Sequence, residues 1–267
     1  MHIKNSTVLA LLLLAAQFAK AQTPTTWNNK ACAVVLTYDD AIDVDLDNVV
    51  PALDSLNLKG TFYLIGSSPV VIKRINEWRT VAAHGHELGN HSLFHPCDGN
   101  LPGRSFVTPD YDLSKYTVVR AVNEVKVNNT LLKAIDGKDN RTFAYPCGDL
   151  KIGDAYFYDN LKNDFVGARG VTGGLQKIME IDLTNIDCYA INMQTANYMI
   201  GLVKQAMQTH TLLVFLFHGV GGGHNINEPL ADHSKLLHFL AENQQNIWVA
   251  PMVDVATYIK NYQNAHK

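Results

Sequence analysis

Short apolar runs alternate along this chain with longer segments that carry apolar residues at helical spacing. We expect strands at residues 33–38, 61–65, 87–89, 142–145, 165–168, 211–217 and 247–249. We expect helices at 45–56, 69–83, 114–135, 153–163, 196–210 and 233–243. Such alternation is typical of parallel strands covered by helices, either as a barrel or as an open sheet. The sequence therefore predicts a single α/β domain.

The first residues have the composition of an export signal. Lys4 precedes the apolar run 8–19, and Ala19 and Ala21 are small residues where a signal peptidase reads the chain. The run is shorter than the about 20 residues that a membrane-spanning helix needs. We therefore expect a signal peptide at 1–21, a catalytic domain at 22–267, and a periplasmic or extracellular protein without a membrane anchor.

Charge and cysteine content narrow the functional classes. The formal net charge is −3 and the sequence contains no run rich in Lys and Arg, which argues against nucleic acid as a partner. Four cysteines in an exported chain permit disulfides, but they form no CxxC pair and so predict no cysteine-based zinc site. The sequence does not indicate an oligomeric state.

Polar residues with catalytic chemistry follow several of the expected strands. Asp39 and Asp40 end the first of them, and His218 follows the strand at 211–217. Asp is also common in ordinary turns after strands. In an α/β barrel, however, the C-terminal ends of the strands meet at one face, where active sites gather. We therefore expect these side chains to lie close together.

A histidine pair in the window HGHELGNHSLFHP suggests a metal. His91 and His95 have the i, i+4 spacing that places two imidazoles on one face of a helical turn. Two imidazoles and a carboxylate form a frequent catalytic metal site, with either Asp39 or Asp40 as the third ligand. The other carboxylate then acts as a general base beside a water that the metal activates.

His218 opens the glycine-rich stretch LFHGVGGGH and is the candidate general acid. The glycines are interpreted as room for a ligand or as a mobile loop, because a phosphate loop would need a following Lys and Ser or Thr. The later histidines are interpreted as surface or structural residues: His224, His233 and His238.

Five short motifs occur in order: TYDDA, GTFYL, HSLFH, RTFAYPCGD and LFH. Together they resemble the NodB-type polysaccharide deacetylases, carbohydrate esterase family 4. The resemblance spans roughly residues 33–218, and it implies a single-domain distorted (β/α)7 barrel that hydrolyses acetyl groups on carbohydrate.

The resemblance also implies the roles of the metal-side residues. Asp39 would be the catalytic base, and Arg141 would pair with it. One divalent metal, usually Zn²⁺ although Co²⁺, Ni²⁺ or Mn²⁺ serve in relatives, would bind to Asp40, His91 and His95.

The remaining roles concern the substrate. The backbone N–H of Cys147 would stabilise the oxyanion, Leu216 would line the acetyl pocket, and His218 would protonate the leaving group. Tyr145 is a candidate substrate contact because it lies in the third motif. An aspartate that orients the acid is not evident, since Asp182 and Asp187 have no accompanying Trp.

Two further features sit beside the motifs. Cys97 and Cys147 each follow a site motif, and a disulfide between them is a hypothesis. The stretch 98–112 is the longest irregular segment, and a loop of this length in a compact domain is usually functional or disordered.

Three functions share this set of residues. The leading one is removal of acetyl from an N-acetylated glycan, chitin-oligosaccharide or peptidoglycan-like, by metal-activated water. The second is O-acetyl ester hydrolysis on acetylated xylan or a similar polysaccharide. The third is a non-catalytic carbohydrate-binding relative, which the loss of a ligand, base or acid would favour. All five principal positions are present: Asp39, Asp40, His91, His95 and His218.

Overall fold

The fold is built around one curled parallel sheet. The computed structural model describes residues 26–267, so the expected signal peptide at 1–21 lies outside the described residues. The strands are β1 (Cys32–Asp39), β2 (Thr61–Leu64), β3 (Glu87–Asn90), β4 (Phe143–Ala144), β7 (Ala168–Arg169), β8 (Tyr189–Ala190), β9 (Leu212–Phe217) and β12 (Ile247–Val249). Their order is β7-β4-β3-β2-β1-β9-β8, with β12 also paired to β1.

The central strand β1 explains this order. β9 pairs with it from Ala33 to Tyr38 and so occupies one whole edge. The other edge is divided, because β12 pairs with Cys32–Val34 and β2 pairs with Thr37–Asp39. At the far ends of the sheet, a single bridge between Arg169 and Ile186 links β7 to the segment that leads into β8. The sheet is therefore curled into a half-barrel, in agreement with the distorted barrel that the resemblance implies.

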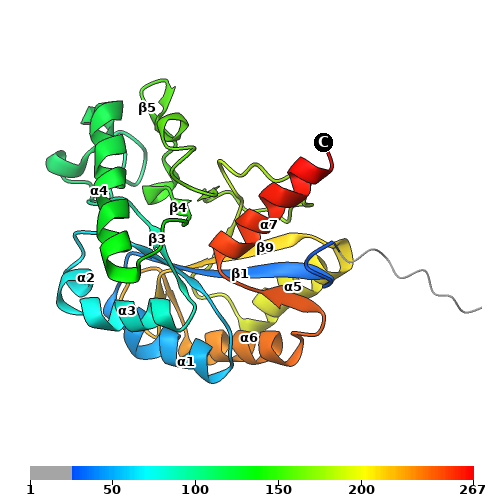
Figure 1. Cartoon of the computed structure of the whole chain (residues 1–267). Coiled ribbons are helices and arrows are strands. Elements are labelled where there is room, and N and C mark those ends of the chain that lie inside the picture. The colour runs from blue at the N-terminus through cyan, green and yellow to red at the C-terminus, as the bar shows by residue number, and fades with distance from the viewer. Residues whose placement is uncertain (1–25) are drawn as a thin grey trace, which may run out of the picture.

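Helices cover the outside of the sheet. They are α1 (Val50–Ser55), preceded by a π-helical turn at Asp45–Val49, then α2 (Pro69–Lys73), α3 (Ile75–Ala83), α4 (Val118–Asp136), α5 (Ala196–Thr209), α6 (Leu230–Glu242) and α7 (Met252–Ala265). Figure 1 shows α1, α3 and α6 along one side of the sheet and α7 on the other. In the described residues, no helix is long and apolar enough to cross a membrane.

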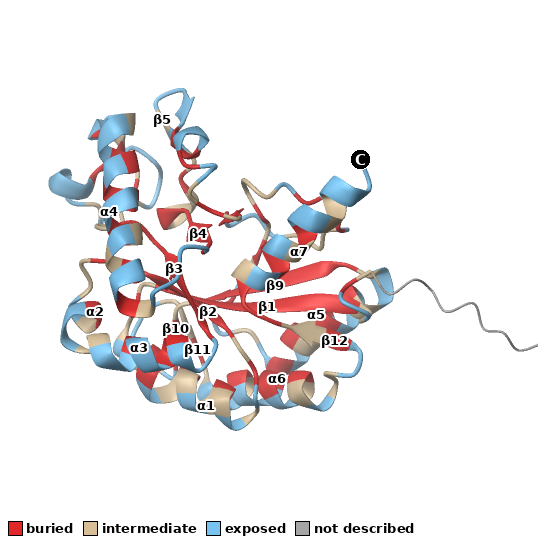
Figure 2. Cartoon of the chain, viewed as in Figure 1, coloured by how far each residue is buried: buried red, intermediate tan, exposed pale blue. Residues whose placement is uncertain are grey.

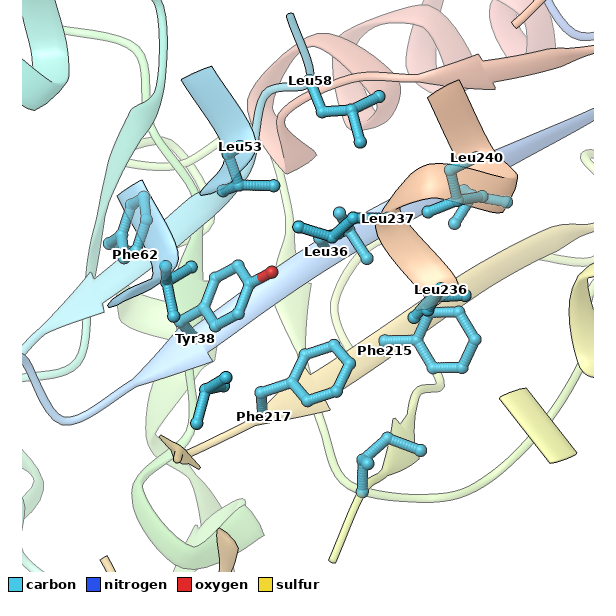
Figure 3. Packing of buried hydrophobic residues seen from close by; sticks show 14 of the residues in the cluster. Leu36, Tyr38, Leu53, Leu58, Phe62, Phe215, Phe217, Leu236, Leu237 and Leu240 are labelled. Atoms are coloured by element: carbon cyan, nitrogen blue, oxygen red, sulfur yellow. The ribbon is translucent and has the colours of Figure 1, made fainter. Parts of the chain in front are cut away.

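The two faces of β1 belong to two different cores. Val34, Leu36 and Tyr38 pack among residues of α1, α5 and α6, as Figure 3 shows for the leucines and aromatic rings. Ala33 and Val35 point the other way, into a core that includes residues of α7. Fully burying one such aliphatic or aromatic side chain contributes about 1.5–3 kcal/mol. Because side chains alternate along a strand, Asp39 at the end of β1 faces the same side as Ala33 and Val35.

The outer surfaces of the helices are exposed, and their apolar stripes face the sheet (Figure 2). The seven expected strands and five of the six expected helical segments are present, with ends shifted by a few residues and with 69–83 divided into α2 and α3. The largest differences between expectation and structure concern two helices.

The expected helix at 153–163 is wrong. The segment instead contributes a strand of a short hairpin, β5 (Lys151–Ile152) with β6 (Ala155–Tyr156), followed by a 3₁₀ turn at Phe157–Asn160. Gly153 at φ 57° makes the hairpin turn, which a helix could not contain. The second difference is α7, which was not expected and which begins directly after Pro251.

Candidate metal centre and active site

Asp39, His91 and His218 lie together at the C-terminal ends of the strands, as expected. Asp39 ends β1, and its register partner on β2 is Tyr63. Phe217 on β9 pairs with Tyr38, so the next residue, His218, lies beside Asp39. On the other side, His91 follows the last residue of β3. The parallel sheet therefore brings residues from distant parts of the sequence to one face.

Three side chains form a metal-ligand set. Nε2 of His91 and Nε2 of His95 each lie 3.6 Å from Oδ1 of Asp40. The three ligand atoms lie within 4.8 Å of one another. The expected helical turn is wrong, because residues 91–95 form a loop in which Ser92 and His95 have positive φ angles. The two imidazoles are brought together by this loop and not by a helix.

Buried hydrogen bonds hold this loop. Nδ1 of His91 lies 2.8 Å from the carbonyl oxygen of Ala144, to which it donates, so that Nε2 faces Asp40 with its lone pair. The Asn128 amide on α4 donates to the carbonyl oxygens of Leu64 and Ser92. The ring of His91 and the backbone of the loop are thus held in place by the protein itself.

The donor set fits a divalent cation. Oδ1 of Asp40 is buried and finds no hydrogen-bond partner in the described part of the chain. Burial and the neighbouring Asp39 raise the pKa of the Asp40 carboxyl, and burial lowers the pKa of His91 to about 3 and that of His95. Ligands about 2.1 Å from a tetrahedral zinc lie about 3.4 Å from one another, close to the separations found here.

Asp39 is paired with a different arginine from the one expected. Nη2 of Arg169, the last residue of β7, lies 2.5 Å from Oδ2 of Asp39. Burial alone would raise the pKa of the Asp39 carboxyl, but the charges of Arg169, His91 and His218 bring it below its ordinary value. Oδ1 of Asp39 is buried and has no partner among residues 26–267. An ionised carboxylate with a free oxygen is what a general base requires.

The expected pairing of Arg141 with Asp39 is therefore wrong. The Arg141 guanidinium binds the Asp136 carboxylate at 3.2 Å and donates to the carbonyl oxygens of Leu88 and Lys138. The reason is position, because Arg141 precedes β4 and so lies at the N-terminal end of the barrel. Arg169 directly follows the expected strand 165–168, and the rule about strand ends would have found it.

His218 and a second histidine stand on the opposite side of Asp40. Nδ1 of His218 is buried and makes no hydrogen bond within the described chain. Asp182 accepts hydrogen bonds from its neighbour Thr184 instead. Burial lowers the pKa of His218, while Asp39 and Asp40 act to raise it. His224, interpreted as a surface or structural residue, stacks on His218 with ring centroids 4.8 Å apart, and no local pattern indicated this.

The disulfide hypothesis is confirmed. Cys97 and Cys147 are bonded, and their Cα atoms lie 5.8 Å apart. The bond joins the loop of His95 to the loop after β4, and Nη2 of Arg104 donates to the carbonyl oxygen of Cys147 at 3.0 Å. Cys147 has a positive φ of 56°. The expected oxyanion role of its N–H stays a prediction.

Two further expected residues are buried near the site. Tyr145 follows β4 and donates its hydroxyl to the carbonyl oxygen of Thr184 at 2.8 Å. Leu216 lies on β9 opposite Thr37 and belongs to the core that contains α7. Both are more than nine-tenths buried. Their contacts with substrate stay predictions.

An aromatic groove adjoins the metal-ligand set. It has a volume of about 170 Å³, and it is lined by Phe94, His95, Cys97, Phe106, Val107, Thr108 and Tyr111. The rings of Phe94 and Tyr111 are stacked, and Phe106 is 63% exposed. A larger cavity of about 540 Å³ includes Arg141 and lies at the N-terminal ends of the strands, away from this chemistry.

Comparisons with known proteins agree with this geometry. A family model described as polysaccharide deacetylase matches residues 28–162, just over half of the chain. A gellan lyase from a Bacillus species is 31% identical over 146 residues, which are 55% of this chain and 5% of that protein. A peptidoglycan-N-acetylglucosamine deacetylase from Bacillus cereus is 38% identical over 73 residues, which are 26% of this chain and 24% of that protein. The chain thus spans less than a quarter of the length of either curated relative.

The fold is also found in solved structures. A protein from Mycobacterium smegmatis, which carries a provisional polysaccharide deacetylase name, has a TM-score of 0.62 and 14% identity. The match covers 88% of this chain and 92% of that chain. At this identity the likeness concerns the fold alone. With the family match over residues 28–162, the motifs and the ligand set in place, the chain belongs to the polysaccharide deacetylase family.

Proposed function

We propose that this protein removes acetyl groups from an N-acetylated glycan, a chitin-oligosaccharide or a peptidoglycan-like strand. The observation that carries the proposal is the contrast between two adjacent carboxylates. Asp39 is held ionised by Arg169, whereas Asp40 faces two neutral imidazoles with an unpaired oxygen. One carboxylate is thus suited to accept a proton and the other to bind a cation.

The cation site supports hydrolysis. Asp40, His91 and His95 would hold one divalent ion, with zinc the expected metal. When bound, such an ion supplies Lewis-acid activation of water and polarises a carbonyl oxygen. Asp39 would take the proton from the attacking water at Oδ1, the oxygen that Arg169 leaves free. A positioned base of this kind accelerates a reaction typically by about 10²–10⁴-fold.

The opposite side of the site supplies the acid. His218 lies next to Asp39 at the end of β9 and would protonate the departing amine. The nitrogen of an amide leaves less readily than the oxygen of an ester unless it is protonated, so an imidazole placed to donate a proton suits an N-acetyl substrate. The N–H of Cys147 would stabilise the oxyanion, and Leu216 would pack against the acetyl methyl group.

The groove beside His95 supports a carbohydrate substrate. Aromatic faces are suited to pack against sugar rings, and Phe94, Phe106 and Tyr111 offer them directly next to the proposed metal ligand His95. The loop 98–112, which carries Phe106 and Tyr111, is held by contacts within itself and with the segment after β4. Asp112 accepts from the backbone N–H of Gly99, and Arg104 forms an ion pair with Asp149 at 3.0 Å.

We also propose that the protein works outside the cytoplasm. The disulfide between Cys97 and Cys147 supports this, because such bonds persist mainly in oxidising compartments. The composition of residues 1–21 gives the same indication.

Acetate release from paired substrates tests the proposed function. The purified domain would be stripped of metal by chelation, restored with zinc, and assayed on an N-acetylglucosamine oligomer and on an O-acetylated xylo-oligomer. We expect metal-restored release from the first. Release from the second alone would replace the amide with the ester as substrate, and release from neither, with metal bound, would overturn the proposal.

A further inference from the structure

We propose that His224 is a positioning residue that holds the metal ligand Asp40 through its second carboxylate oxygen, and so raises the affinity of the site for a divalent cation. The inference rests on the metal centre of the proposed function. It concerns a residue outside the ligand set of Asp40, His91 and His95.

The two oxygens of Asp40 face different partners. Oδ1 lies 3.6 Å from Nε2 of both His91 and His95, at the point where the cation would bind. Oδ2 lies 3.8 Å from Nε2 of His224. A shift of about 1 Å brings this pair to hydrogen-bond distance. A carboxylate restrained through Oδ2 presents Oδ1 to the cation as a single, oriented ligand atom.

A hydrogen bond on the other ring nitrogen decides what His224 does. Nδ1 of His224 lies 3.0 Å from the backbone nitrogen of Ile226, which can donate to it, and 3.3 Å from the carbonyl oxygen of Ile226, which can only accept from it. The shorter contact is a hydrogen bond in the tautomer with an unprotonated Nδ1, and in that neutral ring Nε2 carries the hydrogen. Nε2 faces Asp40 as a donor and has no lone pair for a metal. In this tautomer His224 is a hydrogen-bond donor to the ligand and not a fourth ligand.

The glycine run places this ring. The strands β10 (Gly219–Val220) and β11 (Asn227–Glu228) pair, and the backbone N–H of Gly222 donates to the Asn227 side chain at 2.7 Å. Gly221 at φ 74° could not carry a side chain, because a Cβ there would lie 2.4 Å from Leu230. The glycines thus form a tight turn, whereas the sequence suggested only room for a ligand or a mobile loop. The turn returns the chain so that His224 stacks on His218 at an interplanar angle of 16°.

Residues that orient a metal ligand change metal affinity when they are removed, typically by about 10–100-fold. We therefore expect His224→Ala to weaken zinc binding by this factor. The measurement is the zinc dissociation constant of the whole domain, by competition with a chromogenic chelator, with no substrate present. Circular dichroism of the metal-free proteins would show that each variant is folded.

Three further variants test whether the effect comes from a hydrogen bond that orients Asp40 or only from the size of the side chain at position 224. The amide nitrogen of Gln reaches the place of Nε2 and that of Asn the place of Nδ1, so His224→Gln should restore most of the affinity and His224→Asn should not. His238→Ala, at an exposed histidine bonded to Ser234 on α6, should bind zinc as the wild type does.

Two outcomes would overturn the inference. One is zinc affinity of His224→Ala within twofold of the wild type, and the other is equal loss in the Gln and Asn variants. This result is independent of the acetate assay. If zinc affinity falls in His224→Ala but the wild type releases no acetate, only the proposed function is overturned. If the wild type releases acetate but His224→Ala binds zinc as tightly as the wild type, only this inference is overturned.

Discussion

The two ends of the barrel treat a buried carboxylate in opposite ways. Glu87 opens β3 at the N-terminal end, and its oxygens accept four hydrogen bonds, from the Thr61 hydroxyl, the Thr142 hydroxyl, and the backbone N–H groups of Thr142 and Val253. Asp39 closes β1 at the C-terminal end, where Oδ2 binds Arg169 and Oδ1 has no partner within residues 26–267.

This difference distinguishes a carboxylate that stabilises the fold from one that is available for catalysis. A buried polar atom without a partner costs about 1–3 kcal/mol, so native proteins retain few of them. At the N-terminal end Glu87 ties β2, β4 and the start of α7 together, and each of its oxygens is satisfied. At the C-terminal end, within residues 26–267, the buried atoms without a hydrogen-bond partner include Asp39 Oδ1, Asp40 Oδ1, Arg169 Nε and His218 Nδ1. Their clustering is the mark of a site that an external ligand completes.

The largest effect is expected when Asp39, the carboxylate with an unpaired oxygen, is replaced by a neutral amide. Asp39→Asn should lower kcat by about 10²–10⁴-fold, because the amide cannot accept the proton from water. Zinc content should remain at the wild-type level, since the ligand set is intact. Steady-state kinetics together with metal analysis would measure both. Turnover within tenfold of the wild type would remove Asp39 from the role of base.

The two arginines offer the next test. Arg169 lowers the pKa of Asp39, so Arg169→Gln should let that pKa rise and keep the base protonated to higher pH. The acidic limb of kcat/KM should therefore move upward by about 1–3 pH units. Arg141→Gln should leave that limb in place. It should lower the free energy of unfolding by about 3–5 kcal/mol, because the buried carboxylate of Asp136 loses its charged partner. An unmoved limb in Arg169→Gln would contradict the pairing deduced for Asp39.

The smallest effect is expected at Glu87, the carboxylate whose oxygens all accept hydrogen bonds. Glu87→Gln turns an amide N–H₂ toward groups that themselves donate, which should lower the free energy of unfolding by about 1–3 kcal/mol with little change in kcat. Urea unfolding measures it, and Glu180→Gln at an exposed site is the matched control, expected within about 0.5 kcal/mol of the wild type. A variant of Glu87 with wild-type stability and impaired turnover would reverse the assignment of the two ends.

Much of the barrel was predictable because its strands are short apolar runs with polar ends. Thr211–Phe217 shows this clearly, since six of its residues form β9 and His218 follows at the active face. The expected helix at 153–163 failed because Phe157 and Tyr158 bury their rings from a 3₁₀ turn, which imitates helical spacing. β8 escaped notice because two residues carry no periodicity.

The site divided in the same way. Asp40, His91 and His95 lie inside motifs, so the sequence alone was enough to name them as candidate metal ligands. The arginine that pairs with Asp39 could not be named in this way. Arg141 lies in the motif, but it is Arg169, on the neighbouring strand β7, that reaches the Asp39 carboxylate. His224 depends on a tight glycine turn whose direction only the fold determines.

The pairing of Asp39 with Arg169 has a consequence for how preparations of this protein should be judged. The metal ligands lie within 56 residues of chain, from 40 to 95, whereas Asp39 and Arg169 are 130 residues apart. Contacts between distant residues form only after long loops have closed. With the proposed metal site, a chain in which β1 to β4 have assembled would have its ligands in place before β7 brings the Arg169 guanidinium to Asp39. Metal content would then count every molecule that has completed this first step of assembly, and active-site titration would count those that have also completed the last.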